Sequence, residues 1–387
     1  MRIADGIEGT SGSSSRRQPN WKEGRILYAQ TAEEARVQPA ILCLGTSLPS
    51  SRYSEEEIYT MACAYSEIYR NPRVRQLFMN SDIDYRHLYL NRDEVNGPET
   101  SDELHERFRR GAIDIGATAI TTCLANGGFD VAGIDFIVVA TSTGYLCPGL
   151  CPIFVKELGF RKNVQRADLV GMGCAGAMPA LQRAYDFVKA QPEKRALVLT
   201  VEICSACYYL DDSLETMVGN IICGDGAAAV VVGMTEESPV PRIAGFETRL
   251  ESALLETVGF DQRDGKLRII LSKDIRDLAG GLARGLVDAL LEEHRVQKDD
   301  ISHWIIHSGG RKVIDTIQRD LGLTDAQVRD SRHVLKQFGN MSSPTVLFVL
   351  QETLRNANGD AQPKNGDLGV MLALGPGLAV EAALLAW

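Results

Sequence analysis

Cys174 is the side chain in this sequence whose setting best suits a nucleophile. It lies in Asp168–Ala180 (DLVGMGCAGAMPA), where a short apolar stretch ends in glycines, a cysteine stands at the turn, and a helix is expected to follow. Small neighbours at such a turn let a substrate approach closely, and the N–H groups at a helix start favour a thiolate. A free thiol is only a few per cent ionised at neutral pH, so a nearby base would raise its reactivity. The same pattern also fits a small buried cysteine in a tight turn.

A histidine and an asparagine occupy comparable positions further along the chain. His307 follows the apolar run Trp304–Ile306 and precedes Ser308–Gly310, and the ends of buried strands are where α/β proteins place their sites. Asn340 lies in Phe338–Ser343 (FGNMSS), at an expected helix start. Purely structural roles stay open for both residues. A histidine at a strand end can donate a hydrogen bond to a backbone carbonyl, and asparagine is a common helix cap or turn residue.

Buried strands and helices alternate around these turns. Short runs of β-branched and small apolar residues predict strands, and helical spacing of apolar residues predicts helices. The predicted strands are Phe136–Thr141, Ala196–Val201, Ala227–Val232 and Trp304–His307, the predicted helices include Gly111–Asn126, Met178–Lys189, Ile275–His294 and Ser343–Arg355, and Gly369–Ala386 is predicted to form a closing hairpin. Such alternation indicates an α/β sheet protein.

The order of elements occurs twice along the chain. Asp135–Thr141 resembles Asp300–His307, since each has a polar lead, a buried strand and then small residues. We therefore predict two related halves, residues 39–238 carrying the cysteine and residues 239–387 carrying the histidine and asparagine. The polar segment 1–38 is predicted to be disordered or extended. A coincidence between common α/β units is the alternative.

Composition excludes several classes of function. The chain has 387 residues, 44% of them hydrophobic, and a formal net charge of -10, which supports a sizeable core and argues against nucleic acid as a partner. No run approaches the roughly 18 apolar residues of a membrane helix, and no secretory signal is apparent. We therefore expect no membrane insertion and a cytoplasmic location.

The cysteines support the same conclusion. Their number, nine, is odd, and most of them lie in apolar runs, as expected for a reduced protein. Cys204 and Cys207 form a C-x-x-C, which is compatible with a redox or metal site. No second pair or histidine partner lies nearby in the sequence, so no metal site is predicted.

Five short motifs follow one another in a characteristic order. They are Gly171–Gly176 (GMGCAG), Gly224–Ala228 (GDGAA), Ile306–Gly310 (IHSGG), Phe338–Ser343 (FGNMSS) and Leu374–Leu378 (LGPGL). Together they resemble the type III polyketide synthases, the chalcone-synthase-like branch of the thiolase superfamily, from about Ala40 to Trp387. Arg75–Leu90, Thr141–Gly149 and His307–Asp315 resemble the bacterial dihydroxyphenylacetyl-CoA synthases, and bacterial alkylresorcinol and alkylpyrone synthases share much of this pattern.

The resemblance implies a thiolase-like, five-layered αβαβα fold, a homodimer and a carbon–carbon-bond-forming acyltransferase. Cys174 would take an acyl group from an acyl-CoA starter, and His307 would stabilise its thiolate as an ion pair. Asn340 and His307 would donate hydrogen bonds to the thioester carbonyl of malonyl-CoA as CO2 leaves. The extended chain would cyclise to a resorcinol-, phenol- or pyrone-type product. No metal or organic cofactor is needed, because the thioester and the departing CO2 supply the driving chemistry.

The resemblance also assigns residues to a pocket and to a CoA tunnel. The pocket and gate positions are Ser142, Thr143, Cys147, Cys204, Cys207, Cys223, Ile269, Ser342, Gly375, Pro376 and Gly377. Arg73, Arg75 and Lys312 would bind CoA, although Gln76 and Asn80 interrupt the family's basic cluster. Many members carry phenylalanine at the gate positions held here by Cys223 and Ile269, which predicts a wider gate and a bulkier or longer acyl group. At Cys147 the neighbouring subunit is expected to contribute to the cavity, because the family places this loop at the dimer interface.

Three other functions compete with this interpretation. A dihydroxyphenylacetyl-CoA synthase would use malonyl-CoA alone, and the altered gate speaks against it. A ketoacyl-carrier-protein synthase III shares the fold and the triad, but the Gly-Pro-Gly loop and Gly-Asn-Met-Ser-Ser favour the polyketide branch. A Cys-His-Asn thiol hydrolase of the papain kind lacks its usual sequence around the cysteine. The starter, the number of extensions and the mode of ring closure are not readable from the sequence.

Overall fold

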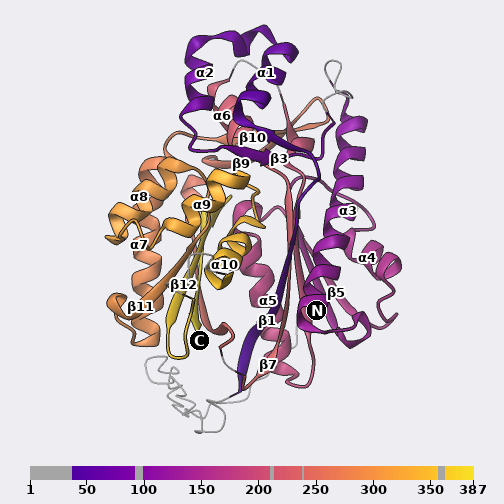
Figure 1. Ribbon diagram of the computed structural model, residues 1–387, viewed down its shortest axis with the longest axis vertical. Helices are drawn as coiled ribbons and strands as arrows, with labels where there is room; N and C mark the ends of the chain where they lie inside the picture. The colour runs from indigo at the N-terminus through magenta and orange to yellow at the C-terminus, as the bar shows by residue number, and fades with distance from the viewer. Residues whose placement is uncertain (1–36, 92–98, 210–212, 238, 356–361) are drawn as a thin grey trace, which may run out of the picture. The chain divides into compact units, whose positions relative to one another are not determined.

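A nine-stranded sheet runs through the computed structural model of the protein (Figure 1). The structure describes residues 37–91, 99–209, 213–237, 239–355 and 362–387, all within one unit, Arg36–Trp387. Residues 1–36, which make up most of the segment predicted to be disordered or extended, lie outside the described residues.

The sheet consists of two halves, and four strands of the first half repeat the strand directions of the second. The first contains, in spatial order, β5 (Gln165–Val170), β4 (Phe136–Thr141), β6 (Ala196–Glu202), β7 (Gly226–Thr235) and β1 (Gln38–Ser47). The second contains β11 (Ile301–Ile306), β12 (Leu368–Gly375), β13 (Ala379–Ala386) and β8 (Arg242–Leu250).

In the first half β4 and β6 are parallel, and β6–β7 and β7–β1 are antiparallel. In the second half β11 and β12 are parallel, and β12–β13 and β13–β8 are antiparallel. This matching pattern confirms the repeat, and the halves meet where Ala40 pairs with Arg242. The boundary at residues 238–239 stays a prediction, and residue 238 lies outside the described residues.

Helices cover both halves and also fill the space between them (Figure 1). The central layer is α5 (Ala177–Ala190) and α10 (Thr345–Arg355), whose apolar side chains pack with strands of both halves. The outer layers are α3 (Ser101–Gly127) and α4 (Leu150–Leu158) over the first half, and α7 (Ile275–His294) and α8 (Arg311–Leu321) over the second. Strands such as β6, buried along its whole length, read as continuous apolar runs because helices cover both faces. The five-layered αβαβα prediction is confirmed.

Most predicted elements agree with the structure to within a few residues. β4 and α7 have the predicted bounds, and the closing hairpin forms between β12 and β13. The helix predicted from Ser343 begins instead at Thr345. Ser343 precedes Pro344, and a residue before proline is disfavoured in the helical region.

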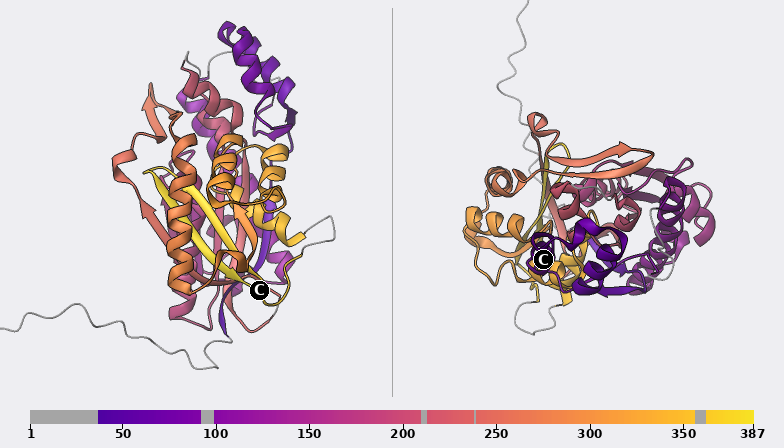
Figure 2. Two further views of the ribbon diagram at one scale, coloured as in Figure 1. Left: turned by 90° about the vertical axis from the view of Figure 1, so that its left-hand side faces the viewer. Right: turned by 90° about the horizontal axis from the view of Figure 1, so that it is seen from above.

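Smaller elements lie at one end of the sheet. They are β2 (Arg52–Ser54), α1 (Glu55–Tyr65), α2 (Pro72–Met79), β3 (Tyr85–His87), α6 (Leu214–Ile222), α9 (Arg329–Phe338) and the hairpin of β9 (Val258–Arg263) and β10 (Lys266–Leu271). Figure 2 shows this hairpin, in coral, beside the central sheet and separate from it. Within the described part of the chain, no helix is both long and apolar enough to span a membrane.

Candidate active site

Cys174 lies in the turn between the edge strand β5 and the central helix α5, as the sequence predicts. The turn is the short helix η3 (Gly173–Ala175), and the Cys174 side chain is half-buried. Gly173 has φ +52°, a left-handed conformation that glycine adopts without steric cost. The Gly173 N–H donates to Ser142 Oγ at 2.7 Å, so a predicted pocket residue helps to hold the turn.

The Gly-Pro-Gly loop packs directly on this turn. A Cβ atom on Gly173 would lie 2.4 Å from Pro376 Cδ, and one on Gly375 would lie 2.8 Å from the Ala175 backbone nitrogen. Both distances are too short for real atoms, so a side chain at either position would push the loop away from the nucleophile. The second half of the chain thus reaches the cysteine through close backbone contact.

Asn340 faces the cysteine with its amide group. Both atoms of that amide lie 3.9 Å from Cys174 Sγ. Asn340 Oδ1 accepts a hydrogen bond from the Ser342 N–H at 2.8 Å, and Nδ2, besides facing Cys174 Sγ, has a long contact of 3.4 Å with the Gly309 carbonyl. The amide orientation is therefore fixed by its oxygen, while its N–H group stays available to a substrate. Asn340 precedes α10 by several residues and is not its cap.

His307 follows β11 and is 2% exposed. Its backbone N–H donates to the Leu372 carbonyl at 2.8 Å, which extends the pairing of β11 with β12. Among the described residues neither ring nitrogen has a hydrogen-bond partner. A Cβ atom on Gly309 would lie 3.4 Å from His307 Nε2, so the same glycine neighbours both the histidine ring and the Asn340 amide. Buried polar atoms without partners are uncommon, and here they suggest a place for a ligand.

Burial controls the protonation of the cysteine and the histidine. It raises the pKa of Cys174 to about 12, hydrogen bonding with Ser342 and Asn340 opposes this shift, and the electrostatic interactions of the thiolate with Cys223 and Glu202 add to it. Burial alone lowers the pKa of His307 to about 4. Both shifts favour a neutral thiol and a neutral imidazole, and the ion pair expected from the sequence stays a prediction.

Glu202 is a site residue that the sequence reasoning missed. It ends β6, is fully buried, and its Oε2 accepts from the Ser142 N–H at 2.9 Å and from the Thr143 N–H and hydroxyl at 3.1 and 2.9 Å. Its Oε1 accepts from the Ser343 hydroxyl at 2.7 Å. Burial raises the pKa of Glu202 against the effect of these donors. One carboxylate therefore joins the loop after β4 to the segment that follows Asn340.

Three further cysteines surround this centre. Cys204 and Cys207 are buried in the short helix η4 (Cys204–Cys207), and Cys207 Sγ contacts the Thr143 carbonyl at 3.3 Å. Cys223 ends α6 and forms an isolated bridge with Asn340. In the described part of the chain no cluster of three or more His, Cys, Asp or Glu side chains is arranged to hold a metal ion. Ala206 of the C-x-x-C segment lines the cavity described next, and Cys204 and Cys207 are not among its lining residues, so their role in the pocket stays a prediction.

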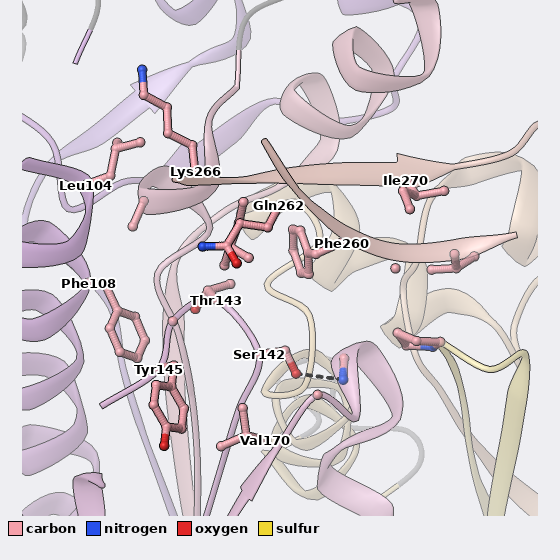
Figure 3. Close-up of a pocket in the computed structure, with 18 of the residues that line it drawn as sticks. Leu104, Phe108, Ser142, Thr143, Tyr145, Val170, Phe260, Gln262, Lys266 and Ile270 are labelled. Carbon is pink, nitrogen blue, oxygen red and sulfur yellow. Dashed lines mark hydrogen bonds between the residues drawn. The ribbon is translucent and has the colours of Figure 1, made fainter. Parts of the chain in front are cut away.

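A cavity of about 920 Å³ opens beside the nucleophile turn (Figure 3). The predicted residues Ser142, Thr143, Pro376 and Gly377 line it, together with Gly173. Figure 3 shows Phe108 of α3 on one side and Phe260 and Gln262 of the β9–β10 hairpin on another. The sequence reasoning missed most of this wall, including His105, Phe108, Phe260, Gln262, Lys266 and Ile270.

The two predicted gate residues both contact α6. Cys223 is its C-terminal cap. Ile269 lies over Gly219, where a Cβ atom would be 2.4 Å from Ile269 Cγ2. The cavity is lined by the neighbouring Ile270, and Ile269 is not among its lining residues. Alternate residues of a strand face opposite sides, which explains why only one of these two neighbours reaches the cavity.

The predicted CoA residues lie outside the cavity. Arg73 and Arg75 are exposed on α2, and Arg75 pairs with Glu56 at 3.3 Å. Lys312 is exposed in the first turn of α8. The adjacent Arg311 pairs with Asp82 at 3.7 Å, which brings the start of α8 next to the segment after α2. Cys147, the predicted contact with a second subunit, is also exposed.

Comparison with known proteins gives the same family for both halves. Residues 74–249 match the family described as FAE1/Type III polyketide synthase-like protein. Residues 263–386 match the family described as chalcone and stilbene synthases, C-terminal domain.

Individual relatives cover most of the chain. The 3,5-dihydroxyphenylacetyl-CoA synthase of Amycolatopsis balhimycina is 34% identical over 350 residues, 89% of this chain and 92% of that protein. The alpha-pyrone synthesis polyketide synthase-like Pks18 of Mycobacterium tuberculosis is 32% identical over 293 residues, 74% of each chain. Among solved structures, PKS-I from the brown alga Ectocarpus siliculosus has a TM-score of 0.84 at 28% identity and covers 90% of this chain and 98% of its own.

Proposed function

The chain belongs to the type III polyketide synthases, which are acyl-transferring condensing enzymes, and we propose that Cys174, His307 and Asn340 carry its chemistry. One observation supports this assignment above all. Asn340 lies 3.9 Å from Cys174 Sγ with its N–H group available, and the ring nitrogens of the neighbouring His307 have no partner among the described residues. These contacts support a site in which Cys174 is the nucleophile, His307 the base and Asn340 a hydrogen-bond donor.

The first proposed step is loading of the starter. Cys174 Sγ attacks the thioester carbonyl of an acyl-CoA, and its proton passes to a ring nitrogen of His307. CoA then leaves as a thiol after taking up that proton. Because burial lowers the pKa of His307, its ring is neutral before the attack and can accept the proton of the thiol.

The second proposed step is decarboxylation and chain extension. The Asn340 Nδ2–H group and a His307 N–H group donate to the thioester oxygen of malonyl-CoA, where negative charge develops as CO2 leaves. The resulting enolate attacks the Cys174-bound carbonyl and expels the thiolate. The electrons of the carbon–carboxylate bond that breaks in malonyl-CoA form the new carbon–carbon bond. We therefore propose that no metal or organic cofactor takes part.

The cavity supports an apolar acyl group of some length. Side chains of α3 and of the β9–β10 hairpin provide most of its apolar wall, including Leu104, Phe108, Phe260, Leu267 and Ile270. Neither Cys223 nor Ile269 supplies an aromatic ring at the gate. We propose a bulky or long acyl-CoA starter and a resorcinol-, phenol- or pyrone-type product.

One of these relatives favours a second candidate. The 34% identity to the 3,5-dihydroxyphenylacetyl-CoA synthase supports a reaction that uses malonyl-CoA only, while the 32% identity to the alpha-pyrone enzyme supports the first proposal. The two differ in whether product forms without an added starter. Carrier-protein thioesters are the substrates expected of a ketoacyl synthase III, and the experiment at the end of this section includes them as a third set of substrates.

CoA binding is proposed at the end of the molecule where α2 and α8 approach each other. Arg73, Arg75 and Lys312 are exposed there, and basic side chains bind phosphate groups by charge-assisted hydrogen bonds. We also propose that the reaction takes place in the cytoplasm, because all nine cysteines are unpaired and disulfides are rare in that compartment.

A homodimer is proposed through the free edge of the sheet. β5 is the last strand of the sheet, and an exposed strand edge is a template for pairing with another chain. Tyr145, Val170 and Met172, which lie on and near this edge, are 67%, 49% and 44% exposed. Cys147 belongs to the same loop as Tyr145, so the second subunit would meet the cavity at this edge.

The function is tested by incubating the enzyme with malonyl-CoA alone, with malonyl-CoA plus a panel of acyl-CoA esters of increasing length, and with carrier-protein thioesters. Products are identified by mass spectrometry. We expect cyclised polyketides that contain the longer acyl groups. Dihydroxyphenylacetyl-CoA from malonyl-CoA alone would favour the second candidate, and release of the free acid without extension would contradict both.

A further inference from the structure

Arg86 is a buried cation that none of the steps above uses. It lies at the centre of β3 and its side chain is 0% exposed, although arginine is seldom buried unless paired. Its Nε lies 3.2 Å from Oε2 of Glu55, the first residue of α1, whose side chain is 7% exposed. An ion pair at such depth needs further hydrogen bonds to offset the cost of removing both charges from water, so the other contacts of Arg86 are informative.

Those contacts are at the C-terminus of α6. Arg86 Nη1 donates to the Asn220 carbonyl at 2.7 Å and to the Cys223 carbonyl at 3.0 Å. The last carbonyls of a helix have no partners within the helix, and a cation is favourable beside them. Arg86 therefore fixes the position of this helix end as well as that of the gate residue Cys223.

The same helix end holds the backbone of Asn340. The Asn340 N–H donates to the Ile222 carbonyl at 2.7 Å, and the Gly224 N–H donates to the Asn340 carbonyl at 2.9 Å. The terminal carbonyls of α6 are thus shared, with Arg86 on Asn220 and Cys223 and the catalytic segment on Ile222. A shift of the helix end would move Asn340 with it.

Arg86 also contacts the catalytic segment through its aliphatic stem. A Cβ atom on Gly339 would lie 3.0 Å from Arg86 Cγ and 2.7 Å from the Ile222 carbonyl. Gly339 has φ +69°, so both its conformation and the space around it require glycine. The arginine stem, the helix end and the residue before Asn340 are in mutual contact, and Figure 1 shows β3 and α6 in the same part of the molecule.

We propose that Arg86 is a positioning residue for malonyl-CoA decarboxylation, which aligns the Asn340 amide by clamping the C-terminus of α6. This inference rests on the proposed role of Asn340. The turn that carries Cys174 is built separately, by β5, Ser142 and the Gly-Pro-Gly loop, and none of the contacts described for that turn involves Arg86. Of the influences on the Cys174 pKa named above, that of Asn340 is the smallest. The proposal therefore separates two half-reactions: Arg86 should affect decarboxylation far more than the reactivity of the nucleophile.

The test compares Arg86→Lys with a matched control, Arg52→Lys. Arg52 lies on the adjacent strand β2, is exposed, and donates to Gln337 Oε1 at 3.2 Å, close to the catalytic segment but away from α6. Decarboxylation is measured as acetyl-CoA formed from malonyl-CoA in a Cys174→Ala background, where no extension consumes the enolate. Reactivity of the nucleophile is measured separately, with Cys174 present, as the rate at which iodoacetamide labels the Cys174 peptide.

We expect Arg86→Lys to lower kcat for decarboxylation about 10- to 100-fold, because a displacement of about 1 Å can lower a catalytic rate about 100-fold. The KM for malonyl-CoA and the labelling rate of Cys174 should stay within about threefold of the parent. Arg52→Lys should leave both rates within about twofold. Unchanged decarboxylation in Arg86→Lys, or a parallel fall in decarboxylation and labelling, would overturn the proposal, since a parallel fall indicates a merely structural role.

Two further variants keep the outcome decisive. If Arg86→Lys does not fold, Glu55→Gln weakens the same clamp while keeping the arginine, and we expect a fall of about three- to tenfold in decarboxylation alone; no fall would overturn the proposal. Asn340→Ala tests the premise. If decarboxylation survives Asn340→Ala unchanged, the proposed function of Asn340 fails, and the role of Arg86 fails with it. A loss in Asn340→Ala without a loss in Arg86→Lys refutes the clamp only.

Discussion

Replacement of Glu202 tests how far the hydrogen bonds that hold the site together contribute to stability, without changing Cys174, His307 or Asn340. Glu202→Gln keeps the size of the side chain. The amide oxygen can take the place of Oε2, which accepts from two backbone N–H groups and the Thr143 hydroxyl, and the Ser343 hydroxyl can rotate to accept from the amide nitrogen. Hydrogen bonds to charged groups contribute about 1.5–3 kcal/mol and neutral ones about 0.5–1.5 kcal/mol. The free energy of unfolding therefore falls by about 1 kcal/mol for each hydrogen bond that no longer involves a charge. This fall is partly offset because the folded protein no longer buries a charged group.

Glu202→Ala has a larger expected cost. It leaves the Ser142 and Thr143 N–H groups buried without a partner, and each such group costs about 1–3 kcal/mol. We expect the free energy of unfolding to fall by about 2–6 kcal/mol in urea denaturation, against about 1–2 kcal/mol for Glu202→Gln. Equal losses in the two variants would show that the N–H groups find other partners.

The glutamine variant also changes the electrostatics of the nucleophile. The charge of Glu202 contributes to the raised pKa of Cys174, so its removal should lower that pKa and increase the rate of iodoacetamide labelling at pH 8. Because burial raises the pKa of Glu202 itself, the folded protein holds this proton to higher pH than the unfolded chain. The contribution of Glu202 to stability then falls as pH rises through its folded pKa, and Glu202→Gln should remove that decline.

The matched control is Glu381→Gln. Glu381 is also a buried carboxyl group with a pKa raised by burial, but its partner is the Thr248 hydroxyl, between β8 and β13. It should change stability without changing the labelling of Cys174. Slower labelling in Glu202→Gln, or equal acceleration in both variants, would refute the electrostatic reasoning.

Three further changes test the site directly. Cys174→Ala should abolish both the acyl-enzyme, seen by intact mass, and polyketide release, and full product formation would disprove the assigned nucleophile. Cys223→Phe should narrow the gate and shift the product masses toward smaller starters, whereas an unchanged chain-length profile would count against the gate. Gly173→Ala should place a methyl group 2.4 Å from Pro376 Cδ and abolish acylation. Its control is Gly171→Ala, because Gly171 has φ +85° but open space around it. The control should lower the free energy of unfolding by only the roughly 1–2 kcal/mol that a left-handed backbone costs alanine.

Much of the fold was readable from the sequence because its strands are buried on both faces. β4, β6 and β7 are continuous apolar runs bounded by polar or glycine-containing segments, and the periodicity of α7 gave its exact span. The cavity wall was not readable. Phe260, Gln262 and Lys266 come from a half-exposed hairpin with mixed residues, and their role depends on a tertiary position, across the cavity from Phe108 of α3, that no local pattern encodes.

The buried charged residues could not be predicted from the sequence either, because their burial also depends on tertiary contacts. Arg86 lies in DIDYRHLYL, a stretch that mixes charged and apolar residues without a clear period. Glu55 precedes it on α1, and the two carbonyl groups that it contacts are 134 and 137 residues away in the chain. A charged residue can be recognised as buried only when its partners are placed, because an unpaired charge would not be tolerated there.

Glu202 is different, since one criterion applied to the sequence selects it. His307 stood out as a polar side chain that follows a buried strand, and Glu202 likewise ends the apolar run of β6. In the repeat, β4 and β6 correspond to β11 and β12, and their carboxyl ends carry Thr141, Glu202, His307 and Gly375. The carboxyl ends of neighbouring parallel strands lie at one edge of a sheet, where α/β proteins place their sites. Once the duplication is recognised, a functional residue at one strand end therefore predicts that the equivalent ends are occupied by residues of the same site.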